Sequence, residues 1–300
     1  MNGTEALAER FEAHREHLRT VAYRMLGSLD DADDAVQAAW LRVDRAGIDG
    51  VENLGGWLTT VTARVCLDML RIRRTRSEEP LAAAPEAVLE RPGGPEPEQE
   101  AVLAESVGLA MLVVLGRLTP AERVAFVLHD MFAVPFAEIA PVVGRTPVAS
   151  KKLASRARER VRGRAALDEV DLARHYTVVD AFLAASRGGD LDTLVELLAP
   201  DVVRRVDRFA VPTGVAGEVR GARSVAEETR MFAHRARLGA VALVDGRPGI
   251  VIAPGGRLFA VLRLSFADGR ITDIEVIADP TRLAEMPLGA GAHDGRPLGG

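Results

Sequence analysis

Basic side chains are concentrated in one stretch of this 300-residue chain, between residues 145 and 164. The stretch carries eight bases against a single acid, Glu159, which gives a local charge of +7. The bases are Arg145, Lys151, Lys152, Arg156, Arg158, Arg160, Arg162 and Arg164. This density of cations suits the phosphate backbone of a nucleic acid, because each cation that neutralises a phosphate releases counterions. A helix that carries them fits the major groove of DNA. The alternative is a solvated basic helix that only ends a domain.

The total charge of the chain conceals this basic stretch. The formal net charge is −5, yet residues 77–105 hold eight acids against Arg91, a local charge of −7 that offsets the +7. Residues 77–102 also contain five prolines and little aliphatic patterning. A segment of this composition buries too little apolar surface to offset the entropy of ordering, so we expect an acidic linker there.

Two short helices with a tight turn between them are predicted to position the basic stretch. Residues 136–143 form the first helix, residues 144–146 the turn, and the second helix starts with Thr146 as its N-cap. This layout is a helix-turn-helix. A narrow apolar seam on the second helix consists of Leu153, Ala157 and Val161. Side chains predicted to face outward from it are Ser150, Lys151, Lys152, Ser155 and Arg158.

The rest of the chain divides into helical segments and one mixed segment. Apolar residues at three- and four-residue spacing predict three helices within residues 8–76, and a capping box at Thr119 and Glu122 predicts another helix in residues 103–165. From about residue 171 two helices, and a third near residues 222–236, precede alternating strands. Asp-Gly pairs at 245–246 and 268–269 predict hairpins, so residues 171–288 are expected to form a separate α+β domain.

No catalytic signature occurs in the first 170 residues. The candidate acid/base residues of the mixed segment are His175, His234, Asp207 and Asp245. Surface or core-edge positions explain them better than catalysis does, because the sequence shows neither a cavity nor an orienting partner. The single cysteine, Cys66, excludes a disulfide framework and a multi-cysteine zinc site. We therefore expect no enzyme, no cofactor and no metal. The charged N-terminus and the short apolar runs predict a cytoplasmic protein without a membrane anchor.

Two stretches of the sequence resemble a known family. FEAHREHLRTVAYRMLGSLDDADDAVQAAWLRV with WLTTVTARVCLDMLRIR is similar to region 2 of extracytoplasmic-function sigma factors, and LTPAERVAFVLHDMFAVPFAEIAPVVGRTPVASKKLASRARERVR is similar to their region 4. The closing segment 278–283 and the layout of residues 171–288 resemble a SnoaL-like domain, a cone-shaped α+β fold found in the SigJ-like subgroup. The resemblance implies two all-α sigma domains, residues 8–76 and 103–165, joined by the linker 77–102 and followed by a SnoaL-like cone with an antiparallel sheet.

The resemblance also implies partners and the residues that contact them. Core RNA polymerase, through its beta and beta-prime subunits, would bind Asp33, Asp34, Gln37, Trp40 and Arg42. The −10 promoter element would be opened and bound by Asn53, Arg64, Asp68, Arg71 and Arg73, with a flipped base held in the loop before Trp57. The −35 element would be contacted by Arg145, Thr146, Ser150, Lys151, Lys152, Ser155, Arg156 and Arg158. Without the resemblance, the preferred interpretation of residues 57–76 is an amphipathic core helix with a solvated tail. The acids at 30–34 would then be a favourable helix N-terminus.

The resulting hypothesis is a sigma factor for promoter-specific initiation that its own C-terminal domain regulates, without a separate anti-sigma protein. The acidic linker would then imitate a nucleic-acid strand in the polymerase channel. One alternative makes the C-terminal domain a small-molecule sensor or a cyclase-like enzyme. A second alternative is an operator-binding regulator that never joins polymerase.

Overall fold

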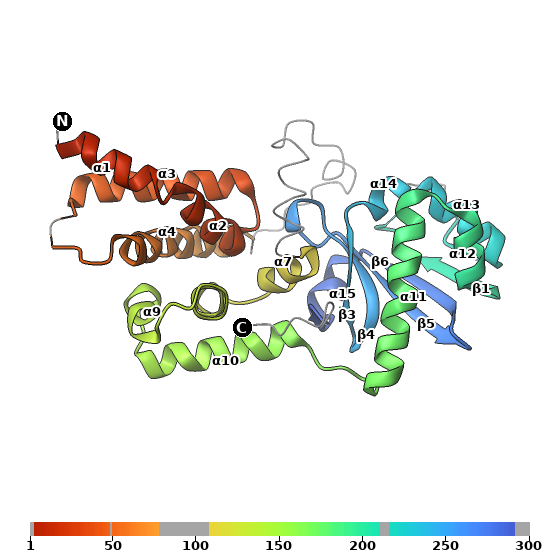
Figure 1. Cartoon of the computed structure of the whole chain (residues 1–300). Helices are drawn as coiled ribbons and strands as arrows, with labels where there is room; N and C mark the ends of the chain where they lie inside the picture. The colour runs from red at the N-terminus through yellow and green to blue at the C-terminus, as the bar shows by residue number, and fades with distance from the viewer. Residues whose placement is uncertain (1–2, 49, 78–107, 211–215, 292–300) are drawn as a thin grey trace.

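The computed structural model describes residues 3–48, 50–77, 108–210 and 216–291. Its first part is an N-terminal helical unit of four helices (Figure 1). These are α1 (Gly3–Glu12), α2 (Arg15–Leu26), α3 (Leu29–Ala46) and α4 (Leu54–Ser77). The predicted break between α2 and α3 is confirmed, since Gly27 ends α2 with a positive φ of 79° and Ser28 is the N-cap of α3. The apolar faces of these helices form one buried core together with apolar side chains from residues 111–161.

A second set of helices forms the helix-turn-helix unit. It consists of α7 (Leu109–Gly116), α8 (Pro120–Phe126), the π-helical turn η1 (Val127–Met131), α9 (Phe136–Val143) and α10 (Pro147–Arg162). The predicted turn is confirmed: Gly144 ends α9 with a φ of 68°, and the Thr146 hydroxyl accepts a hydrogen bond from the Ala149 N–H at 3.2 Å. The proline that follows fits the first helical position because its missing N–H has no partner to lose there.

The predicted capping box at the start of α8 is confirmed as well. The Glu122 N–H donates to the Thr119 hydroxyl at 3.3 Å, and the Thr119 N–H donates to the Glu122 carboxylate at 3.1 Å. The Glu122 carboxylate is buried and also accepts from Arg160 at 2.9 Å. One residue therefore caps α8 and holds α10 against it.

Replacing Thr119 with alanine should destabilise this unit by about 1–2 kcal/mol, because the substitution leaves the Glu122 N–H without its side-chain partner. The measurement is urea denaturation followed by far-UV circular dichroism. Thr119→Ser keeps the hydroxyl and is the matched control. An alanine variant as stable as the serine variant would mean that the cap contributes nothing.

The C-terminal domain begins with two helices and continues into a seven-stranded sheet. The helices are α11 (Glu169–Gly188), α12 (Leu191–Leu197), α13 (Ala222–Met231), α14 (Ala233–Ala236) and α15 (Pro280–Glu285), with a 3₁₀ turn η2 (Pro254–Gly256). The strands are β1 (Leu198–Val206), β2 (Glu218–Arg220), β3 (Gly239–Val244), β4 (Arg247–Ile252), β5 (Ala260–Ala267), β6 (Arg270–Ile277) and β7 (Leu288–Gly289). Their order in the sheet is β2-β1-β6-β5-β4-β3-β7.

The α+β class and the two predicted hairpins are confirmed. Asp245 and Gly246 join β3 to β4, and Asp268 and Gly269 join β5 to β6, with all four residues at positive φ as a type I′ turn requires. Strands β3 to β6 form an antiparallel meander. The expected antiparallel sheet is present with one exception: β1 lies parallel to β6. This pairing joins residues far apart in sequence, and no turn signal announces it.

The two faces of this sheet are covered by different parts of the chain. On one face α11 and α13 enclose an apolar core, which gives the cone shape (Figure 1). On the other face, Val251 and Val261 pack in a second cluster with Ala110 and Val113 of α7. The C-terminal domain is thus joined to the helix-turn-helix unit through a shared apolar cluster.

The acidic linker 77–102 lies outside the described residues, apart from Ser77 at the end of α4. None of the helices that the structure describes is long and apolar enough to cross a membrane.

Candidate nucleic-acid interface

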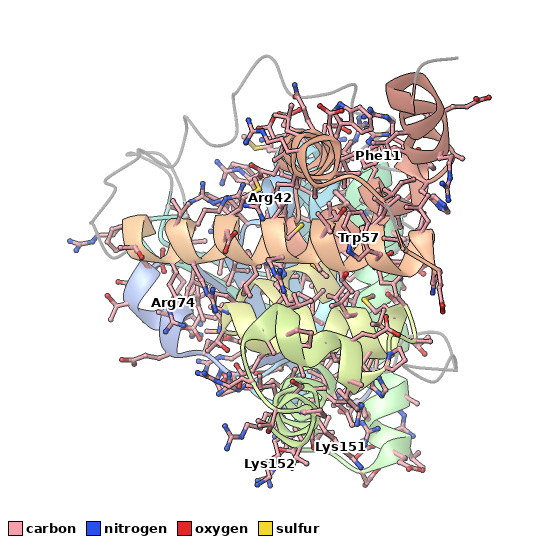
Figure 2. All side chains as sticks on the ribbon, turned by 90° about the vertical axis from the view of Figure 1, so that its left-hand side faces the viewer. Phe11, Arg42, Trp57, Arg74, Lys151 and Lys152 are labelled. Carbon is pink, nitrogen blue, oxygen red and sulfur yellow. The ribbon has the colours of Figure 1, made fainter. Side chains whose placement is uncertain are left out.

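Helix α10 presents an exposed basic face. Lys151 and Lys152 project away from the body of the molecule (Figure 2). The other predicted −35 contacts that are exposed are Arg145, Thr146, Ser155 and Arg156. These side chains form the exposed α10 face, which is defined by these six residues. Exposed cations of this kind bind phosphates, and the N-terminal half of a recognition helix contacts base edges.

Two of the predicted −35 contacts lie elsewhere. Ser150 is 0% exposed and its hydroxyl donates to the Thr146 carbonyl at 3.0 Å, so the prediction that it faces outward is wrong. The signal was present in the sequence, because Ser150 stands four residues before the buried Ala154 on the same helical face. Arg158 is half-buried and its Nε donates to the Asp130 carboxylate at 2.7 Å. Arg158 therefore holds α10 against η1.

The predicted −10 residues are spread along α4 and the loop before it. The Asn53 carboxamide accepts from the Gly56 N–H at 3.0 Å and so caps the helix. Asp68 pairs with Arg42 at 3.2 Å, which brings together two residues predicted for different sites. Arg73 forms an ion pair with Asp31 of α3, and Arg71 is exposed. The arginines and the carboxylates of this surface partly neutralise each other.

The predicted polymerase-binding residues share the outer side of α3. Asp33, Asp34 and Gln37 are exposed, and Asp33 pairs with Arg19 at 2.9 Å. Trp40 is partly buried and packs edge-on against Phe11, with 5.1 Å between ring centroids. Helix α3 thus offers an acidic face beside an anchored aromatic ring.

Arg64, predicted to contact the −10 element, instead reaches the helix-turn-helix unit. Its guanidinium donates to the Pro141 carbonyl of α9 at 3.0 Å. A hollow of about 490 Å³ lies beside this contact, between the loop 50–53 with Trp57 on one side and Glu138 with Pro141 on the other. The loop that the resemblance assigns to a flipped base therefore faces α9 (Figure 2).

The contact between the two helical units contains an aromatic ring and a buried cation. Phe132 lies between the His17 ring, at a centroid distance of 5.5 Å, and the Arg24 guanidinium at 5.2 Å. Arg123 of α8 is 6% exposed, and its Nη2 donates a long hydrogen bond of 3.5 Å to the Arg24 carbonyl. Its Nε has no hydrogen-bond partner among the described residues. Burial, with the nearby Arg73 cation, lowers the pKa of Arg123 to about 10.

The C-terminal domain contacts the helix-turn-helix unit through backbone and arginine contacts. Arg117, at the end of α7, donates to the Met286 carbonyl at 2.5 Å and to the Leu283 carbonyl, at the end of α15. These carbonyls are among the groups that the end of a helix leaves without partners. The Ala290 N–H donates to the Val161 carbonyl of α10 at 2.8 Å. Burial lowers the pKa of the Arg117 guanidinium.

The four acid/base candidates of the C-terminal domain do not converge. The Asp207 carboxylate accepts from the backbone N–H groups of Phe209, Ala278 and Asp279, and so shapes a turn. Asp245 lies in the β3–β4 turn, and His234 is exposed. His175 stacks on Phe266 with 4.1 Å between ring centroids, and burial lowers its pKa. No group of three metal-ligating side chains occurs in the part of the chain that the structure describes.

The sequence was compared with family models and with curated proteins. Residues 10–76 match the model for Sigma-70 region 2, and residues 109–161 match the model for Sigma-70 region 4. The ECF RNA polymerase sigma factor SigJ of Mycobacterium tuberculosis is 40% identical over 293 residues, which are 93% of each chain. The probable ECF RNA polymerase sigma factor SigI of the same species is 36% identical over 295 residues, 97% of this chain and 100% of the relative.

A solved structure was also found. The crystal structure of the extracytoplasmic-function sigma factor SigJ of Mycobacterium tuberculosis is 37% identical, with a TM-score of 0.45. The match covers 92% of this chain and 98% of that one. Two sigma region models in the expected order, and relatives above 35% identity along nearly the whole length, agree with the exposed basic helix. The chain belongs to the family of extracytoplasmic-function RNA polymerase sigma factors.

Proposed function

We propose that the C-terminal domain of this sigma factor inhibits initiation in cis, by holding the two helical units in the arrangement seen here. The exposed α10 face would bind the −35 element, α4 with Arg71 the −10 element, and α3 core polymerase. The observation that supports the proposal is the hydrogen bond from Arg64, one of the proposed −10 residues, to the Pro141 carbonyl of the helix-turn-helix unit.

Simple geometry separates this arrangement from promoter binding. The −10 and −35 elements are named for their positions relative to the transcription start, which differ by about 25 base pairs. At a rise of about 3.4 Å per base pair, their centres lie about 85 Å apart along the DNA. Helix α10, with its 16 residues, is only about 24 Å long. A helix-turn-helix unit that touches Arg64 therefore cannot occupy the distal element while α4 occupies the proximal one. Between Ser77 and Gly108 the extended chain spans at most about 105 Å, so covalent linkage permits the units to separate.

The C-terminal domain holds one of the two units in place. Val251 and Val261 of its sheet pack on α7. Arg117, at the end of α7, donates hydrogen bonds to the carbonyls at the end of α15. Displacing α7 from the C-terminal domain would expose this apolar cluster and break hydrogen bonds to a charged donor, which contribute about 1.5–3 kcal/mol each. The domain thereby takes the place of a separate anti-sigma protein.

In vitro transcription with core polymerase on a genomic promoter library tests the proposal. A chain ending at Asp168 lacks the C-terminal domain and should initiate more often than residues 1–300, because nothing then fixes α7. Fewer transcripts from the shortened chain would contradict inhibition and make the domain a required activator. No transcripts and no core binding by either chain would contradict the role assigned to α3.

A single substitution tests the same contact without truncation. Arg117→Ala removes both hydrogen bonds to the end of α15 and should raise initiation by the full-length chain several-fold. Arg270→Ala, at an exposed position of the β5–β6 hairpin, is the matched control and should leave initiation unchanged. Equal initiation by the two variants would exclude Arg117 from the closed arrangement.

Regulation rather than catalysis is the proposed role of the C-terminal domain. Asp207 accepts hydrogen bonds from backbone N–H groups, His175 stacks on an aromatic ring, and His234 is exposed to solvent. These acid/base candidates do not form one site. Substituting His234 and Asp207 singly, and finding the promoter activity of the folded chain unchanged, is the result expected for a non-catalytic domain.

A further inference from the structure

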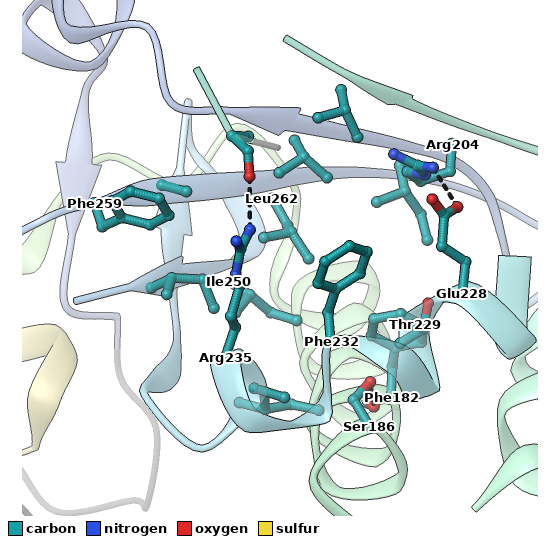
Figure 3. Close-up of a pocket in the computed structure, with 18 residues that line it drawn as sticks. Phe182, Ser186, Arg204, Glu228, Thr229, Phe232, Arg235, Ile250, Phe259 and Leu262 are labelled. Carbon is teal, nitrogen blue, oxygen red and sulfur yellow. Dashed lines mark hydrogen bonds and ion pairs between the residues drawn. The ribbon is translucent and has the colours of Figure 1, made fainter. Parts of the chain in front are cut away.

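A cavity of about 110 Å³ lies inside the C-terminal domain, between the helices and the sheet (Figure 3). Most of its lining is apolar and comes from α11, α14 and the strands β4 to β6. An apolar cavity of about 150 Å³ is known to accept a single benzene ring in place of water. The volume and the lining of this cavity therefore favour a compact apolar group of similar size.

The charged groups of the lining lie at two ends of the cavity, and the hydroxyls of Ser186 and Thr229 donate to carbonyls of their own helices. At one end Arg204 forms an ion pair with Glu228, and both side chains are largely buried. At the other end Arg235 donates to the Ala210 carbonyl at 2.6 Å and lies over the rings of Phe232 and Phe259, at 5.0 and 5.9 Å. Figure 3 shows Phe232 between the two ends. The lining thus carries two guanidinium groups and one carboxylate.

We propose that this cavity binds a small monocarboxylic acid whose apolar body is one ring or a short branched chain. The apolar body of the ligand would fill the cavity and contact its apolar lining. The carboxylate of the ligand would form an ion pair with the guanidinium of Arg235. A guanidinium presents five N–H donors in a planar fork that matches a carboxylate, so it can bind one while still donating to a carbonyl. A water-excluded cavity strengthens this ion pair relative to the same pair in water.

The same strands that line the cavity also carry the contact with α7. Successive side chains of a strand point to opposite faces of the sheet. Ile250 and Ile252 of β4 line the cavity, whereas Val251, between them, packs against α7. On β5, Val261 packs toward α7 from between Ala260 and Leu262, which line the cavity. A ligand that spreads β4 and β5 therefore changes the surface on which α7 is seated.

Binding is tested on the full chain with three probes: benzoate, isovalerate and toluene. Saturation-transfer NMR and thermal melting should show saturable binding of benzoate. Arg235→Met should weaken the affinity for benzoate at least tenfold and leave the affinity for toluene unchanged. Arg237→Met, at an exposed position two residues away, should leave both affinities unchanged. Binding of none of the probes overturns the site, and binding of toluene alone overturns the choice of a carboxylic acid.

A second pair of variants keeps the site testable if Arg235→Met fails to fold. Ala260→Leu fills the cavity from β5 and should abolish binding of benzoate and toluene alike. Ala267→Leu, at the exposed end of the same strand, is its control and should bind both. Equal binding by the two leucine variants would show that the probes bind elsewhere.

The readout through α7 rests on the proposed function, and hydrogen exchange separates the two. Benzoate should change amide exchange in α7, residues 109–116, and leave α3 unchanged. Binding without a change in α7 overturns the coupling. A change in α7 without a change in initiation contradicts inhibition in cis and leaves the binding site standing.

Discussion

Replacing Lys151, Lys152 and Arg156 together with alanine is expected to weaken promoter binding by about ten- to a hundredfold near 150 mM salt. All three side chains are exposed on α10, and in the described part of the chain none of them forms an ion pair that would occupy its charge. Each phosphate contact that is lost should reduce the slope of log binding constant against log salt concentration by about one. Fluorescence anisotropy on duplex DNA at several salt concentrations, with the chain ending at Asp168, measures both quantities.

The matched control uses bases of the same helix that the fold already employs. Arg158→Ala and Arg160→Ala remove ion pairs with Asp130 and Glu122, so they should reduce thermal stability more than the salt slope. A triple variant with an unchanged salt slope would mean that the exposed α10 face does not meet phosphates. A control pair with the larger change in slope would move the DNA contact to the C-terminal half of α10.

Local signals in the sequence predicted most of the elements. The Thr-Pro pairs before α8 and α10 fix where those helices begin, because a hydroxyl cap and a proline both act within one helical turn. The Asp-Gly pairs fix two hairpins in the same way, since their residues tolerate positive φ. These features depend only on residues adjacent in the chain, so sequence alone is enough to place them.

Features that depend on distant contacts were not predictable. The parallel pairing of β1 with β6 joins two strands that no local turn connects. Arg64 looks like an exposed base on a helix, and only the fold brings the Pro141 carbonyl to it. The same holds for Arg123, which follows a good capping box at a position where arginine is usually solvated. Pattern and propensity report which face of a helix is apolar, and they do not report what packs on its polar face.

Arg123 makes the closed arrangement of the two helical units easy to open. A cation removed from water loses most of its hydration, and the single long hydrogen bond to the Arg24 carbonyl replaces little of it. The neighbouring cation Arg73 adds repulsion, and the thiol of the buried Cys66 remains neutral because burial raises its pKa to about 12. The contact therefore contains a destabilising group beside the apolar cluster that the two helical units share.

Arg123→Met should accordingly tighten the closed arrangement, because methionine fills a similar volume without a charge. Replacing buried charges with apolar side chains of similar size often stabilises proteins by about 1–4 kcal/mol. A gain of about 1.4 kcal/mol shifts the balance between open and closed states tenfold, so initiation by the full chain should fall about tenfold while the melting temperature rises. In vitro transcription and calorimetry measure the two effects.

A comparison of the full chain with the chain ending at Asp168 shows whether the fall in initiation reflects a more stable closed arrangement. In the chain ending at Asp168 the open state already predominates under the proposed function, so the same gain in stability should lower initiation far less. Arg123→Lys keeps the buried charge and should lower initiation in neither chain. An equal loss in both lengths, with a lower melting temperature, would identify Arg123 as a group that the helix-turn-helix unit needs for its own folding. A loss confined to the full chain would tie the buried cation to release from the C-terminal domain.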